Sequence, residues 1–140
     1  MLPVIVGVAV LLASGVLALA AYRSQRLATA FASFGAVAGC AIAAVPALRA
    51  LGGAPVPEAR HAWAVPVGAL VVGLDPLRAF FLIPLCVLAG LAAIYGRAYL
   101  LAYADRKLLA ASAFVDNLFV ASMIVVVGAR DGVLFLVAWE

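Results

Sequence analysis

The chain has 140 residues, of which 69% are hydrophobic and only 11% are charged, and its mean hydropathy is +1.28. A soluble domain needs about a quarter of its residues charged to cover its surface. A soluble enzyme, a coiled coil and a disordered tail are therefore excluded. The net charge of +3 is small and scattered, so nucleic acid is not an expected partner. We expect an all-α membrane protein with the lipid bilayer as its solvent.

Four apolar stretches are long enough to cross the hydrocarbon core, which takes roughly 20 helical residues for about 30 Å. The expected helices lie at about residues 2–22, 27–51, 76–103 and 108–129. We expect the first to be a retained helix and not a signal peptide, because no Lys or Arg precedes it and Arg23 and Arg26 follow it at once.

A fifth apolar stretch, residues 132–140, is shorter than a membrane span. Nine residues of helix cover about 13 Å, which is less than half of a bilayer. We therefore expect four transmembrane helices plus the start of a fifth. Residues 1–140 would then form a single transmembrane domain, the N-terminal fragment of a larger subunit.

The long connection between the second and third helices contains prolines and glycines that exclude a helix. Residues 61–65 and 69–72 are instead typical of two short strands around a turn at 66–68, which predicts a small β-hairpin. Trp63 suits the headgroup layer. The third helix should begin at Asp75 and Pro76, since Asp is a favoured N-cap and Pro fits the first helical position.

The positive charges favour one orientation in the membrane. Short cytoplasmic loops carry an excess of Lys and Arg, and the tightest clusters flank the first and third connections. These connections should therefore lie inside the cell, with the N-terminus and the hairpin outside. The bases assigned to the inner side are Arg23, Arg26, Arg97, Arg106 and Lys107.

Small residues form a stripe along the second helix, at a spacing that lets another helix approach closely. The pattern fits either a helix-packing face or a specific dimer motif. The two cysteines, Cys40 and Cys86, lie in apolar runs and imply no disulfide. The stripe consists of Ala28, Ala32, Gly35, Gly39 and Ala43.

Two acidic residues lie at membrane depth. Glu140 is about 12 Å into the fifth helix, and Asp116 is about eight residues into the fourth, beside Asn117. Because a charged side chain in the hydrocarbon core of the membrane costs free energy, such residues usually face a polar path or a partner. For Asp116 the alternative is a protonated acid bonded to Asn117 or to a backbone carbonyl, and for Glu140 it is an exposed terminal stub. His61, the only histidine, is expected to be a solvated surface residue without a metal.

Four segments together resemble a known family. They are residues 73–82, 94–100, 117–123 and 134–140. In this order and spacing they resemble the N-terminal part of the antiporter-like membrane subunits of respiratory complex I. The resemblance is strongest to the hydrogenase-four and formate hydrogenlyase membrane subunit, which is similar to the chain-L-type subunit of NADH–quinone oxidoreductase.

The resemblance implies a proton-translocating module in a bacterial inner membrane, with a hairpin after the second helix on the outer face. The family's Trp-Glu pair maps onto Trp139 and Glu140, which makes Glu140 the expected proton-path residue, with Asp116 as a second candidate. Arg78 departs from the serine that the family usually has, and it could extend outward at the helix start. Lysines and a histidine that complete the path in the family lie beyond the fifth helix.

The resemblance further implies that redox chemistry belongs to other subunits. We expect no cofactor, no metal and no catalytic site of the chain's own, with other membrane subunits of a complex-I-like or hydrogenase assembly as partners. Two alternatives remain open: a non-catalytic membrane scaffold and a subunit of a multi-subunit cation/proton antiporter.

Overall fold

The computed structural model describes residues 1–61, 70–102 and 109–140. Within these residues, four helices are long and apolar enough to cross a membrane. The chain is therefore an all-α, multi-pass membrane protein with a very small sheet. Its elements are α1 (Leu2–Ala20), α2 (Gln25–Leu51), β1 (Ala59–His61), β2 (Leu70–Val72), α3 (Pro76–Leu101), α4 (Leu109–Gly128) and α5 (Gly132–Trp139).

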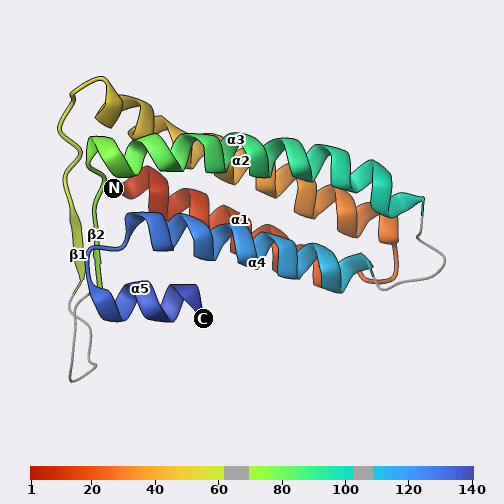
Figure 1. The fold of residues 1–140 in the computed structure, drawn as a ribbon. Coiled ribbons are helices and arrows are strands. Elements are labelled where there is room, and N and C mark those ends of the chain that lie inside the picture. Colours follow the sequence, from red (N-terminus) through yellow and green to blue (C-terminus); the bar gives the residue numbers. More distant parts are fainter. Residues whose placement is uncertain (62–69, 103–108) are drawn as a thin grey trace.

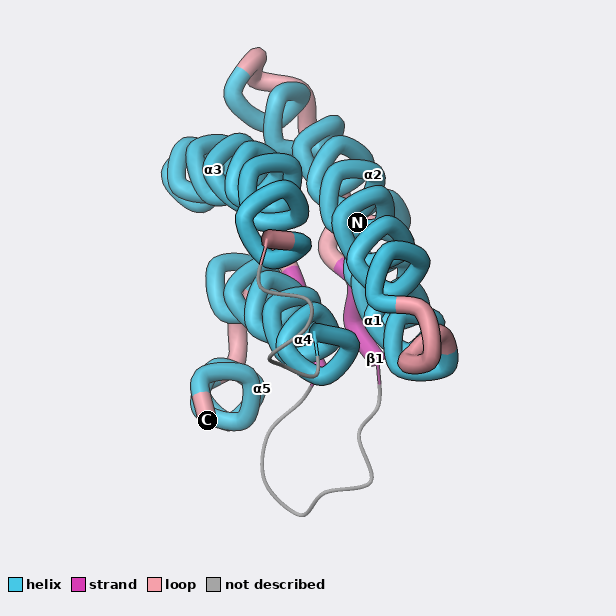
Figure 2. Tube along the Cα trace, turned by 90° about the vertical axis from the view of Figure 1, so that its right-hand side faces the viewer, coloured by secondary structure: helices cyan, strands magenta, loops and turns pink. Residues whose placement is uncertain are grey.

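The four long helices run side by side as a bundle, and the two strands lie across one end of it (Figure 1). We call this the hairpin end; it also holds the N-terminus and the start of α5. The opposite end, with the turn between α1 and α2, is the turn end. Helix α1 packs on α2 and α4, α2 also packs on α3, and α5 packs on α4. Viewed down the bundle, α5 lies on the outer side of α4 (Figure 2).

Glycines allow α1 and α2 to approach closely. A Cβ atom added to Gly7 would lie 2.6 Å from the carbonyl oxygen of Gly39, and one added to Gly39 would lie 2.8 Å from that of Gly7. A Cβ at Gly35 would overlap Ser14. The small-residue stripe is thus a packing face, directed at α1 of the same chain, and close backbone approach stabilises the pair through dispersion contacts.

The turn between α1 and α2 lies two residues earlier in the chain than the hydropathy predicted. Helix α1 ends at Ala20 and not at Tyr22, because the backbone N–H groups of Tyr22 and Ser24 donate to carbonyls three residues back, those of Leu19 and Ala21. Helix α2 begins at Gln25, before the expected start at residue 27. The carbonyl of Ser24 accepts the first bond of this helix, from the backbone N–H of Ala28, and the Gln25 amide oxygen accepts a 3.1 Å bond from the backbone N–H of Leu109 at the start of α4.

The predicted hairpin is present, with its first strand displaced. Strands β1 and β2 are antiparallel, and Ala59 pairs with Val72 and His61 with Leu70. The first strand therefore begins before the expected position at residue 61. Residues 62–69, which include the expected turn and Trp63, lie outside the described residues.

Local hydrogen bonds set the start of α3 and the end of α4. Asp75 caps α3, its carboxylate accepting a 2.8 Å bond from the backbone N–H of Arg78, and Pro76 is the first helical residue, as predicted. Helix α4 ends at Gly128, because Ala129 forms a β-bridge with Val72 instead. The expected end of α3 at residue 103 and start of α4 at 108 lie outside the described residues.

Candidate functional site

Helix α5 carries Glu140 away from the hairpin end. Asp131 caps this helix, and its carboxylate accepts bonds from the backbone N–H groups of Val133 (2.9 Å) and Leu134 (3.3 Å). Glu140 is the C-cap, and its backbone N–H donates to the carbonyl of Leu136. At 1.5 Å per residue, Glu140 lies about 12 Å along the helix from Gly132. Its side chain is exposed to the surroundings of the bundle.

The start of α5 is held by the hairpin. The backbone N–H of Gly73 donates to the carbonyl of Gly128 (2.9 Å), and that of Arg130 donates to Val71 (2.8 Å). These bonds join the end of β2 to the connection between α4 and α5. The direction in which α5 leaves the hairpin end is therefore fixed by main-chain bonds as well as by its own packing.

Two arginines complete this junction. Arg78 turns its guanidinium to the carbonyl of Ala129 and, at 3.3 Å, to that of Gly128, while its Nε lies 3.2 Å from Asp75. Arg78 thus meets the negative C-terminal end of α4. Its position at the start of α3 had suggested that the side chain extends outward, and it does not. Arg130 pairs with Glu58 and lies 3.5 Å from Asp75.

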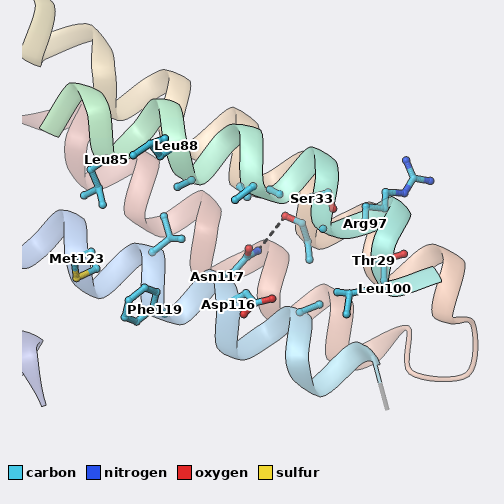
Figure 3. A pocket seen from close by; sticks show the side chains of 18 residues that line it. Thr29, Ser33, Leu85, Leu88, Arg97, Leu100, Asp116, Asn117, Phe119 and Met123 are labelled. Atoms are coloured by element: carbon cyan, nitrogen blue, oxygen red, sulfur yellow. Dashed lines mark hydrogen bonds between the residues drawn. The ribbon is translucent and has the colours of Figure 1, made fainter. Parts of the chain in front are cut away.

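The side-chain amide of Asn117 is a polar group buried inside the bundle. Its side chain is only 3% exposed, and its Nδ2 lies 2.9 Å from Ser14 Oγ, 3.2 Å from the carbonyl of Ala32 and 3.4 Å from that of Leu11. The bond to Ala32 is drawn in Figure 3. One amide thereby joins α4 to both α1 and α2, which satisfies the requirement that buried polar groups be hydrogen-bonded.

Asp116 does not share this network. Its side chain is exposed, and within the described residues no hydrogen bond joins it to Asn117, whose amide turns to α1 and α2. Asp116 instead lines a cavity of about 430 Å³ between α2, α3 and α4. Arg97 of α3, Thr29 and Ser33 of α2, and Asn117 line the same cavity (Figure 3).

The cavity is mostly apolar, and its hydroxyl and charged side chains lie toward one end. Thr29, Ser33, Arg97 and Asp116 each lie within about 12 Å of the turn end, counted along their helices at 1.5 Å per residue. Toward the hairpin end the walls are apolar (Figure 3). The lining residues on that side include Leu85, Leu88, Phe119 and Met123.

The structure thus separates the two predicted acidic residues. Asp116 faces the cavity, whereas none of the described residues that line this cavity belongs to α5, which carries Glu140. Sequence reasoning missed the link from Asn117 to Ser14, although a serine at membrane depth is a signal for such a bond. In comparisons with known proteins, no family model and no curated protein matches this chain.

Proposed function

We propose that this chain belongs to a proton-translocating membrane subunit of the antiporter-like type, in a NADH–quinone oxidoreductase-like or energy-converting hydrogenase complex of a bacterial inner membrane. The placement of Glu140 supports the proposal most directly. It follows Trp139 on a helix that starts from a fixed junction, about 12 Å from that helix's first residue. This matches the Trp-Glu pair that the resemblance assigns to the proton path.

The free-energy cost of a charge inside the membrane favours a role of the Glu140 carboxyl in proton transport. A charge at membrane depth costs at least about 2.5–3.5 kcal/mol, so an acidic residue there usually serves a transport path. Glu140 takes up and releases a proton as charge moves through the neighbouring part of the complex. The exposed apolar faces of α3 and α5, for example at Leu88 and Leu136, would meet lipid or the other membrane subunits.

The test replaces Glu140 by Gln in the natural protein, assembled with its partner subunits in sealed membrane vesicles. The amide keeps the shape of the side chain but cannot release a proton. Proton pumping, followed by quenching of a pH-sensitive dye, should fall about a hundredfold, at the lower end of what a positioned acid–base group contributes. Glu140→Asp should retain part of the activity.

Glu58→Gln is the matched control, because Glu58 is a glutamate of the hairpin-end junction, where it pairs with Arg130. This variant should pump at the wild-type rate. Wild-type pumping by Glu140→Gln would exclude the proton-path role and favour a scaffold that only holds its partners in the membrane. Sodium-dependent pumping that stops in Glu140→Gln would favour the cation/proton antiporter instead.

A further inference from the structure

We infer that the cavity between α2, α3 and α4 is the docking site of a partner transmembrane helix that carries a Lys or Arg side chain opposite Asp116. This inference goes beyond the proposed function, since it concerns a different acidic residue and does not require Glu140 to carry protons. The partner is defined by its chemistry, which is an apolar helix with one cation at membrane depth.

The cavity has the length and the position of a helix-binding surface. Along α3 its lining extends from Leu85 to Leu100, which at 1.5 Å per residue is about 22 Å, or about three quarters of the hydrocarbon core. It opens to the side of the bundle between Leu88, which is 66% exposed, and Phe119, which is 62% exposed. An element that runs parallel to α3 and α4 can therefore enter the cavity from within the membrane.

Small residues form the α3 wall of the cavity. A Cβ atom added to Gly96 would meet no atom within 4 Å, whereas at Gly7 and Gly39 the backbone of the other helix fills that space. Small residues on a membrane helix let a second helix approach closely, as α1 and α2 do in this chain. The space beside Gly96 therefore suits a helix that is not one of the described ones. The other small residues of this wall are Ala89, Ala92 and Ala93.

Asp116 determines which kind of helix fits. Its side chain is exposed, lines the cavity and lies about 10 Å from the start of α4. Among the described residues no salt bridge or side-chain hydrogen bond reaches its carboxyl. Arg97 lines the same cavity, but its guanidinium extends away from Asp116 (Figure 3). Because charged side chains at membrane depth pair with one another, a cation on the docked helix is the complement of this carboxyl.

Lipid alone does not suit this surface. Acyl chains match the apolar walls but offer neither a charge nor a hydrogen bond to a carboxyl. The side chain of Asp116 is also too short to reach the headgroup layer from this depth, as the longer Lys and Arg side chains do. A helix with one basic residue meets both requirements, since its apolar surface covers α3 and α4 while its cation pairs with Asp116.

The test measures binding of synthetic transmembrane peptides to the natural protein in lipid vesicles, by energy transfer from a donor on the protein to an acceptor on the peptide. One peptide is a helix of Leu and Ala with a single Lys placed about 10 Å from its end, the depth of Asp116, and its control has Leu at that position. The Lys peptide should bind at least about tenfold more tightly than the control. Asp116→Asn should lower this preference below about threefold, and Asp116→Lys should reverse it in favour of a peptide with Glu at the same position.

Gly96→Leu and Gly90→Leu separate the cavity from the rest of α3. A Cβ at either position meets no atom within 4 Å, so both variants should fold, which far-ultraviolet circular dichroism checks. Gly96 lines the cavity and Gly90 does not. Gly96→Leu should therefore weaken binding of the Lys peptide about tenfold, and Gly90→Leu should leave it unchanged. Ala92→Leu, on the same wall, serves if Gly96→Leu does not fold.

Equal binding of the Lys and Leu peptides would overturn the inference and leave lipid as the occupant of the cavity. A Lys preference that persists in Asp116→Asn, or that is lost in Glu140→Gln, would overturn it as well, since the cation would then bind elsewhere. Energy transfer between two labelled copies of the protein that is lost in Gly96→Leu would assign the cavity to a second copy instead. Glu140→Gln should keep the preference, because Glu140 does not line the cavity. A failure of this inference is therefore distinguishable from a failure of the proposed proton path.

Discussion

The hydrogen bonds of Asn117 make a quantitative prediction about how the bundle is held together. The side chain is buried where α1, α2 and α4 meet, with contacts of 2.9 Å to Ser14 and 3.2 Å to Ala32. Interhelical hydrogen bonds in membrane proteins contribute about 0.6 kcal/mol each on average and up to about 1.7 kcal/mol. Asn117→Ala should therefore lower the free energy of unfolding by about 1–2 kcal/mol, the third contact at 3.4 Å being too long to add much.

The control is Ser122→Ala on the same helix. The Ser122 hydroxyl is exposed and donates only to the carbonyl of Phe119 in its own helix, so its loss should change the free energy of unfolding by less than about 0.5 kcal/mol. Both variants are compared with the unchanged chain by reversible unfolding with dodecyl sulfate in mixed micelles, followed by far-ultraviolet circular dichroism.

A double-mutant cycle isolates the bond between Asn117 and Ser14. The coupling free energy of Asn117→Ala with Ser14→Ala should be about 0.6–1.7 kcal/mol, because each single change removes the same bond. Asn117→Ala combined with Ser122→Ala should be additive, since these side chains share no partner. If Asn117→Ala is as stable as Ser122→Ala, or if the Ser14 cycle shows no coupling, the network does not stabilise the bundle.

Two further predictions concern the helix contacts. Gly39→Ala should destabilise the chain by about 1–3 kcal/mol, because its Cβ would lie 2.8 Å from the carbonyl of Gly7, whereas Gly90→Ala meets no atom within 4 Å and should be neutral or stabilising. Equal stability of the two variants in the same micelle assay would contradict the close α1–α2 packing. Asp75→Ala should cost about 1 kcal/mol through the lost α3 cap, and Asp75→Asn clearly less, since Asn caps as well as Asp. An equal loss in both would assign the effect to the ion pairs of Asp75.

Features that depend on neighbouring residues alone could be predicted from the sequence. Hydropathy located the four spans, because length and apolar content decide whether a helix can cross a bilayer. The Asp75 cap followed from residue types at adjacent positions. The stripe at Gly35 and Gly39 indicated a packing face or a dimer motif, and its spacing could not name α1 of the same chain as the partner.

Contacts between distant residues were not predictable in this way. Asn117 and Ser14 are 103 positions apart, and nothing local to either residue specifies the other. Pairing Asn117 with Asp116 was wrong for a geometric reason. Neighbouring residues on a helix point in directions about 100° apart, so the Asn117 amide reaches α1 and α2 while the Asp116 carboxylate does not.

The depth of Glu140 is set by the hairpin end and not by α5 alone. Helix α5 is short, and a short helix has little stability of its own. Its starting point is instead fixed by the Asp131 cap and the bond from Arg130 to Val71. This junction is crowded, since a Cβ at Gly73 would lie 2.5 Å from the Arg130 side chain. A change that breaks the main-chain bonds between β2 and residues 128–130 would therefore move the start of α5 and, with it, the position of the carboxyl that the proposed function requires.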